Sequence, residues 1–260
     1  MSITVRGETI VSGGTIGGSR TSVSDGLILH LDTANNRSYP GSGTTWNDLT
    51  SYQNNIIVSG SGSSPVPPTY STEAAGCLYF NDNYSISSNY ADFYAPINSS
   101  TLVTVETWCK LLEKAPPSGY PIIFGWQFYC MFLQSGVGLG YNTFSGDIYG
   151  ISDASIDNLG LIGNWKHYVF VMRGDNSAYG TANKMYINGD NQSLSQISGT
   201  PNTSNINFNN GLGRIANSRR TGAPYYADAL YSVFKVYNRE LTQSEITQNY
   251  NALKNRFGIY

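Results

Sequence analysis

The stretch WKHYVFVMR, residues 165–173, has a clear strand pattern. Successive side chains of a strand point to opposite faces. One face would carry Trp165, His167, Val169 and Val171, and the other Tyr168, Phe170 and Met172. Because both faces are almost wholly apolar, the stretch predicts a strand in the middle of a sheet that is covered on both sides.

Further strand signals lie on both sides of this stretch. They are Leu27 to Leu31, Val103 to Leu111 (VTVETWCKL), Lys184 to Ile187 and Leu230 to Tyr237. Asn188-Gly189 follows the third of these, and this pair favours the two positive φ angles of a type I′ hairpin turn. The chain is therefore predicted to be all-β with antiparallel strands.

One helix is expected, at the end of the chain. Ile246, Tyr250, Leu253 and Phe257 recur at helical spacing. Thr242 and Glu245 have the spacing of a capping box. We therefore predict an amphipathic helix over residues 242–256 that packs against the sandwich.

The composition narrows the class of protein. Of 260 residues only 12% are charged, against an average of about 25% in soluble domains. The net charge of −2 gives no basic excess for binding nucleic acid. The 28 glycines and 20 tyrosines favour turns and strands over a helical bundle. The length suits one large β domain.

The first 24 residues differ from the rest. They mix Gly, Ser and Thr with short apolar pairs, which predicts an extended arm at 1–24 followed by a single domain at 25–260. Four arm residues are expected to make the attachment: Ile3, Val5, Ile10 and Val11. We find no signal peptide and no transmembrane segment. The three cysteines lack metal-site spacing and are expected to be buried free thiols, as in a protein folded in a reducing cytoplasm.

Seven segments in a fixed order carry a resemblance to a known family. They are DGLILHLD (25–32), TWNDLTSYQNN (45–55), CLYFNDN (77–83), VTVETW (103–108), NWKHYVFV (164–171), MYINGD (185–190) and VYNRELTQSEITQNYNALKNRFG (236–258). Over residues 25 to 259 the chain resembles the concanavalin A-like, laminin-G-type jelly-roll family, in the version common in bacteriophage structural proteins. The resemblance implies a two-sheet antiparallel jelly-roll sandwich with one C-terminal helix.

Within that fold several residues are expected to be structural. Trp108 and Trp165 are large enough to fill the space between two curved sheets, and Tyr237 is placed in the core. His167 and His30 are interpreted as buried, hydrogen-bonded core histidines, since the family has His at the matching position.

Catalysis is not expected. Glycosidases that share the fold need two carboxylates about 5 to 9.5 Å apart. No Glu has an acidic residue at the strand spacing of the retaining jelly-roll glucanases, and Glu106 stands alone on its strand. A glycoside hydrolase that depends on Glu106 is kept as the third hypothesis.

Binding is favoured instead, because carbohydrate binding is the commonest activity in the family. Sugar binding needs exposed aromatic rings and hydroxyl-binding polar groups, and loops in Gly-rich segments are expected to present them. The candidates are Trp126, Tyr141, Asn142, Arg219, Arg220, Tyr225 and Tyr226. Arg214, Arg219 and Arg220 form a basic cluster that we expect to meet an acidic neighbouring subunit. Calcium, if any cofactor, is assigned to Asp82 and Asn83 at the rim of the sandwich.

The resemblance and these residues predict a non-enzymatic virion structural protein, a capsid decoration protein that displays a lectin-like jelly roll. The expected partners are the major capsid protein or neighbouring subunits, in several copies, together with host-surface glycans, but neither nucleic acid nor membrane. The alternative is a glycan-binding receptor-recognition module of a tail or fibre.

Overall fold

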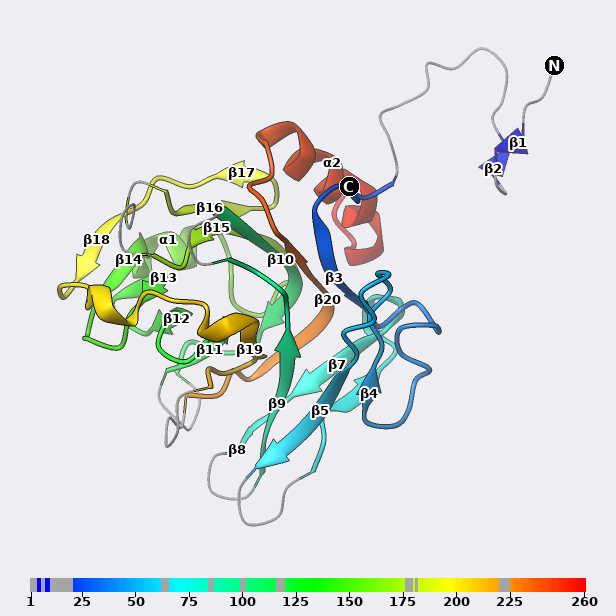
Figure 1. Cartoon of the computed structure of the whole chain (residues 1–260), viewed down its shortest axis with the longest axis horizontal. Coiled ribbons are helices and arrows are strands. Elements are labelled where there is room, and N and C mark those ends of the chain that lie inside the picture. Colours follow the sequence, from blue (N-terminus) through cyan, green and yellow to red (C-terminus); the bar gives the residue numbers. More distant parts are fainter. Residues whose placement is uncertain are drawn as a thin grey trace.

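A computed structural model describes Thr4–Val5, Glu8–Thr9 and residues 21–61, 66–83, 87–98, 102–115, 120–175, 180, 182–219 and 225–260. Four residues predicted to bind a partner or ligand, Ile3, Ile10, Val11 and Arg220, lie outside this part of the chain. Only the backbone of Val5 and Asn83 is described. Two large antiparallel sheets make up the domain (Figure 1), which confirms the predicted sandwich.

The smaller sheet holds eight strands among the described residues. Their order is β17 (Asp190–Asn191), β16 (Lys184–Ile187), β15 (Lys166–Arg173), β10 (Leu102–Leu111), β20 (Ala229–Tyr237), β7 (Cys77–Phe80) and β6 (Thr69–Ser71), with β3 (Leu27–Asp32) also paired to β20. The stretch WKHYVFVMR forms β15, between β16 and β10. The prediction of a central strand is confirmed.

The larger sheet holds ten strands in the described part of the chain. Their order is β18 (Ser195–Ser198), β14 (Ile148–Ser152), β13 (Gly138–Asn142), β12 (Cys130–Gln134), β11 (Ile122–Gly125), β19 (Leu212–Ile215), β9 (Ser87–Tyr94), β5 (Ile56–Ser61) and β4 (Thr45–Trp46), with β8 (Asp82–Asn83) also paired to β9. Apart from both sheets, β1 (Thr4–Val5) pairs with β2 (Glu8–Thr9).

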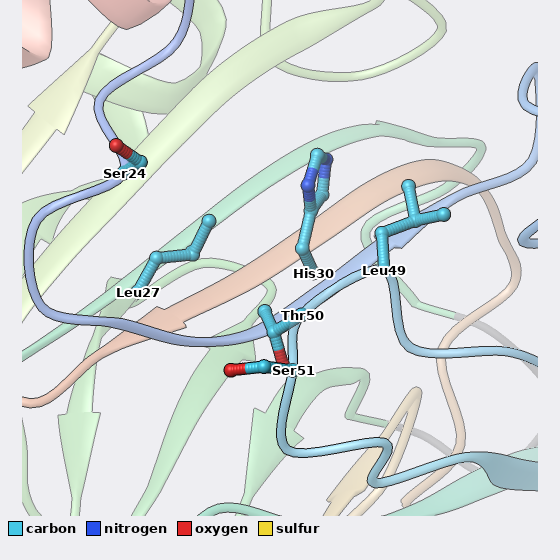
Figure 2. A pocket seen from close by; sticks show the side chains of 6 residues that line it. All are labelled: Ser24, Leu27, His30, Leu49, Thr50 and Ser51. Atoms are coloured by element: carbon cyan, nitrogen blue, oxygen red, sulfur yellow. The ribbon is translucent and has the colours of Figure 1, made fainter.

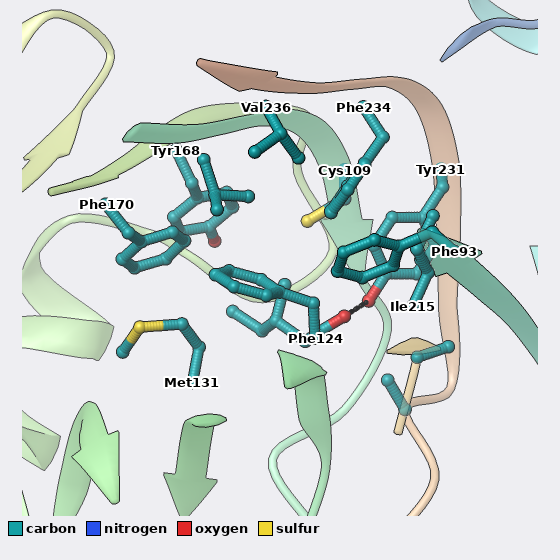
Figure 3. Packing of buried hydrophobic residues seen from close by; sticks show 14 of the residues in the cluster. Phe93, Cys109, Phe124, Met131, Tyr168, Phe170, Ile215, Tyr231, Phe234 and Val236 are labelled. Carbon is teal, nitrogen blue, oxygen red and sulfur yellow. Dashed lines mark hydrogen bonds between the residues drawn. The ribbon is translucent and has the colours of Figure 1, made fainter. Parts of the chain in front are cut away.

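The main hydrophobic core lies between the two sheets (Figure 3). Phe124 of β11 packs against Phe170 of β15 and Phe234 of β20, with ring centroids 5.5 and 5.8 Å apart. Tyr231 donates its hydroxyl hydrogen to the carbonyl oxygen of Ile123 at 2.8 Å, so even the polar end of this buried side chain is bonded. The three cysteines are buried thiols and form no disulfide, as predicted.

Turns and short helices join these strands. Asn188 and Gly189 have φ angles of 53° and 88° between β16 and β17, as the sequence predicts for this hairpin. The helices are η1 (Glu73–Ala75), α1 (Asp153–Asn158), η3 (Thr203–Asn205), η4 (Asn209–Gly211), α2 (Gln243–Leu253) and η5 (Lys254–Phe257). None of the helices in the described residues is long and apolar enough to cross a membrane.

The C-terminal helix covers the outer face of the smaller sheet, beside β3 and β20 (Figure 1). Thr242 and Glu245 form the predicted capping box at the start of α2. The helix ends earlier than predicted, at Leu253, and the chain continues as η5. Ile246 packs onto Val169 and Val171, the outward side chains of β15.

The tryptophans predicted to fill the space between the sheets lie elsewhere. Cys109 points into the main core, so its neighbour Trp108 points outward and stacks on Phe257 of η5, with ring centroids 4.1 Å apart. Trp165 precedes β15, is only partly buried and donates its indole hydrogen to Glu73 at 2.8 Å. Both rings belong to the layer between sheet and helix, and this part of the prediction is wrong.

Candidate functional site

A cluster of charged side chains is buried under α2. Glu106 of β10 and Lys235 of β20 are direct cross-strand partners, and both are fully buried. Lys235 Nζ lies 3.0 Å from Glu106 Oε1. Nε2 of His167, on β15, lies 3.3 Å from the same oxygen. His167 is buried as predicted, but its contact with a carboxylate was not anticipated.

Polar groups from the helix and from the segment before β3 complete this cluster. Asn249 of α2 donates to Glu106 Oε2 at 2.5 Å and accepts from the backbone N–H of Val23 at 2.7 Å. Lys235 also donates to Ser22 Oγ at 3.1 Å. Tyr237, predicted to be structural, is buried here and donates to the carbonyl oxygen of Val23 at 3.2 Å. Thus contacts with the fold begin before residue 25, the predicted domain boundary.

This environment makes Glu106 unsuitable as a general acid. Burial alone would raise the pKa of the Glu106 carboxyl, but the Lys235 ammonium and the neighbouring His167 hold that pKa well below its usual range. A glycosidase acid needs a raised pKa and access to the sugar oxygen that it protonates. Glu106 has neither property.

The outer face of the larger sheet carries a group of aromatic side chains that we call the outer aromatic cluster: Tyr120, Phe132, Phe144 and Tyr225. Phe132 of β12 points outward because its neighbours Met131 and Leu133 belong to the main core. The Tyr225 ring lies 5.7 Å from that of Phe132 and 5.9 Å from that of Phe144. Tyr120 is 38% exposed, and Tyr225 is half-buried.

The same sheet bears a polar group, the outer arginine cluster: Tyr90, Asp92, Arg214 and Arg219. Arg214 of β19 stands opposite Asp92 of β9 and binds its two carboxylate oxygens at 2.6 and 3.2 Å. Arg219 reaches the same carboxylate at 2.9 Å, and the Arg214 guanidinium lies 3.7 Å from the Tyr90 ring centroid. The acid that these arginines meet is thus in their own chain.

Apolar and aromatic side chains beside the outer arginine cluster are open to solvent. Ile57 of β5 stands opposite Asp92, and Leu212 of β19 stands opposite Tyr94 of β9. Their exposed fractions are 54%, 41% and 44% for Ile57, Leu212 and Tyr94. A sheet face with partly exposed rings and oriented guanidinium groups can contact C–H groups and bind hydroxyl or carbonyl oxygens.

Most of the residues predicted to bind carbohydrate do not lie on this face. Trp126 packs on Phe208 in the core, the Tyr141 hydroxyl donates to the Lys184 carbonyl oxygen, and Asn142 accepts from the backbone of Phe144. These three side chains and Tyr226 are buried, so the expectation that loops present them is wrong. Arg219 and Tyr225 do lie on the outer face.

The error came from interpreting glycines as loop residues. Gly125 and Gly140 lie within β11 and β13. A Cβ at Gly125 would fall 2.3 Å from the Cβ of Cys130, and one at Gly140 would fall 2.3 Å from the carbonyl oxygen of Tyr149. These glycines allow close packing within a sheet.

Five residues of these two clusters were not predicted from the sequence: Tyr90, Asp92, Tyr120, Phe132 and Phe144. For the first two a signal was present in SSNYADFY, where Tyr90 and Asp92 alternate with the apolar Ala91 and Phe93. For Phe132 the signal was the alternation within CMFLQ.

The predicted calcium site at Asp82 and Asn83 is not supported by a group of metal-binding side chains among the described residues. Asp82 is buried, and the side chain of Asn83 is not described. Within the described residues, no three His, Cys, Asp or Glu side chains are grouped so that they could hold a metal ion. Calcium binding at Asp82 stays a prediction.

Comparison with known families decides the relationship. Residues 81–247 match the family model Laminin_G_3, described as the concanavalin A-like lectin/glucanases superfamily. The chain belongs to this superfamily. A search of curated proteins found no match.

Solved structures with a similar fold include toxin binding domains. The binding domain of Paraclostridial Mosquitocidal Protein 1 is 14% identical, with a TM-score of 0.56 over 90% of this chain and 55% of that one. The botulinum neurotoxin serotype D ligand-binding domain, in complex with N-acetylneuraminic acid, is 13% identical, with a TM-score of 0.53 over 87% of this chain and 50% of that one. The chain thus spans about half the length of these structures, and the likeness concerns the fold.

Proposed function

We propose that this protein is a non-enzymatic, lectin-like virion protein that takes carbohydrate on the outer face of the larger sheet. The observation that carries the proposal is that one sheet face holds both clusters: the outer aromatic cluster includes Phe132 of β12, the outer arginine cluster lies on β19 and β9, and β11 separates β12 from β19. Membership of the lectin/glucanase superfamily supports it. The neurotoxin domain with bound N-acetylneuraminic acid is a fold relative that takes a sugar.

The two clusters have complementary tasks in this proposal. Tyr225 and Tyr120 offer ring faces to the C–H groups of a sugar, and Arg219 offers donors to its oxygens. Two guanidinium groups share the Asp92 carboxylate, so the cluster keeps an excess of positive charge. An acidic sugar is therefore favoured over a neutral one.

The absence of catalysis is part of the proposal. Glu106, the carboxylate that a glycosidase would use, is enclosed by Lys235, His167 and Asn249. Glycan binding without sugar release is the expected behaviour.

The virion role rests on the sequence resemblance and on how the chain before β3 is held. Ser22 and Val23 bond to Lys235 and Asn249, so the chain is fixed to the domain at these two residues. We propose that this arm attaches the domain to other virion proteins, the major capsid protein first among them. Display on a tail or fibre as a receptor-recognition module is the second candidate, and glycan binding favours it.

The sugar site is tested by replacing Tyr225. Tyr225→Ala removes a ring from the outer aromatic cluster, and we expect binding to host surface polysaccharide on a glycan array to weaken about tenfold or more. Tyr52→Ala is the matched control, since Tyr52 is 51% exposed and lies outside both clusters. Unchanged binding by Tyr225→Ala, or equal loss in the control, would refute the site.

The arm is tested by deleting residues 1–20, which keeps the bonds of Ser22 and Val23. The truncated protein is expected to fold with an unchanged thermal unfolding curve but to be absent from purified particles. Normal incorporation into particles would refute attachment through the arm.

A further inference from the structure

A small pocket lies at β3 of the smaller sheet, whereas the outer aromatic cluster lies on the larger sheet. Its volume is about 260 Å³, and its walls are Ser24, Leu27, His30, Leu49, Thr50 and Ser51. Figure 2 shows the His30 ring standing between Leu27 on one side and Leu49 on the other. The pocket thus combines two aliphatic side chains with three hydroxyls and one imidazole.

The wall that carries Leu49, Thr50 and Ser51 is held firmly by the Asp48 carboxylate. Asp48 Oδ1 accepts from the backbone N–H groups of His30 and Thr50 at 2.9 and 3.0 Å. Its Oδ2 accepts from the Thr50 hydroxyl at 2.6 Å and from the backbone of Asn54 at 3.1 Å. The loop is thereby fixed to β3, and the pocket is formed before any ligand arrives.

His30 supplies the chemistry. The prediction that it is a buried, hydrogen-bonded core histidine is wrong, because the ring is partly exposed and makes no hydrogen bond to any described residue. Burial, together with the nearby Lys235 ammonium, lowers the pKa of His30 to about 4, although Asp32, Glu106 and Asp48 act in the opposite direction. At neutral pH the ring therefore offers one donor and one acceptor to a ligand.

Charged groups around the pocket already have partners. Lys235 is bound to Glu106, Asp32 is bound to Arg256 at 2.8 Å, and Asp48 accepts the bonds described above. None of the six wall residues carries a fixed charge. A ligand with a net charge would thus find no counter-charge among them.

We propose that this pocket binds one neutral polyhydroxylated ring, such as a single sugar unit. Its C–H groups would lie on Leu27 and Leu49, and its hydroxyls would bond to His30, Ser24 and Ser51. The volume accommodates one such ring. The site is separate from the one proposed for the larger sheet and does not depend on it.

The two histidines of the chain make a direct test. In imidazole NMR spectra at pH 7, D-glucose, D-galactose and N-acetylglucosamine are added singly to the full chain. We expect at least one to shift the His30 signals saturably while those of His167, which is fully buried, stay in place. A response to methyl α-D-glucopyranoside as well would indicate the terminal unit of a glycan.

Ser51→Tyr fills the pocket and should abolish the saturable shift, whereas the control Ser204→Tyr, on η3, should keep it. Tyr225→Ala should also keep it, which separates this site from the sugar site on the larger sheet. No saturable His30 response to any of the sugars, a saturable response only to sodium acetate or phosphate, or persistence of the shift in Ser51→Tyr would each overturn the proposal.

Discussion

The outer faces of the two sheets differ in how far they bury their ion pairs. On the smaller sheet, α2 and Ser22–Val23 cover Glu106 and Lys235 completely, and each polar end of that pair is bonded. On the larger sheet, Arg219 and Asp92 also form an ion pair, but 31% and 37% of their side chains stay exposed. An ion pair is thus buried beneath α2 on the smaller sheet, whereas an ion pair on the larger sheet is exposed to solvent.

The energetic contrast between these ion pairs can be tested directly, and it gives the largest expected effect. Lys235→Met leaves the Glu106 carboxylate buried without its cation, which should cost about 3–5 kcal/mol of unfolding free energy. Arg219→Met removes an exposed partner of Asp92 and should cost about 1 kcal/mol or less. Chemical denaturation at pH 7 measures both values.

A double variant sharpens this comparison. Glu106→Gln combined with Lys235→Met leaves no unpaired charge under α2, so it should be more stable than Lys235→Met alone. Equal costs for Lys235→Met and Arg219→Met, or no recovery in the double variant, would contradict the picture of a closed face and an open face.

The next largest effect on stability is expected at the hydrogen bond between Asn249 of α2 and the backbone of Val23, which precedes β3. Asn249→Ala removes the acceptor of the Val23 N–H and a donor to Glu106, both buried. We expect a loss of about 2–3 kcal/mol, with faster hydrogen exchange of the Val23 amide. Gln248→Ala, which removes an exposed bond to the Thr21 carbonyl oxygen, is the control and should leave that amide protected. Unchanged exchange in Asn249→Ala would mean that Val23 is held by other contacts.

The strands were predictable because alternation reports directly on burial. The segments at β10, β15, β16 and β20 were located within one or two residues, and Thr242 and Glu245 gave the start of α2. Alternation cannot say which of two apolar faces meets the other sheet. Trp108 was therefore assigned to the wrong layer, although its burial was foreseen.

The site was harder to predict because it depends on pairs that are distant in the chain. Asp92 and Arg214 are separated by 122 residues, and Glu106 and Lys235 by 129. A single sequence gives no register between such strands, so Glu106 looked isolated. Trp126 and Tyr141 were predicted to be exposed because they lie near glycines. A glycine in a sequence can mark either a loop or a place where two backbones pack closely in a sheet, and the sequence does not distinguish the two.

The smallest expected effect is the loss of stability in acid that arises from Glu245 at the start of α2, the helix that covers the smaller sheet. Hydrogen bonds from Arg239, opposed by partial burial and aided by Thr242, lower the pKa of Glu245 to about 2. A carboxyl whose folded pKa is depressed adds stability above its unfolded pKa of about 4.3, and this is lost as the pH falls toward 2. Because Glu245 is about a quarter exposed, solvent screening limits the contribution to about 1 kcal/mol.

Glu245→Gln keeps the reach of the capping side chain but removes its charge. The difference in unfolding free energy between wild type and Glu245→Gln should therefore be present at pH 6 and should disappear near pH 2, as followed by denaturation across that range. A difference that stays constant down to pH 2 would show that Glu245 acts through its hydrogen bonds alone, without its charge. The packing of α2 on the smaller sheet would then not depend on the protonation of Glu245.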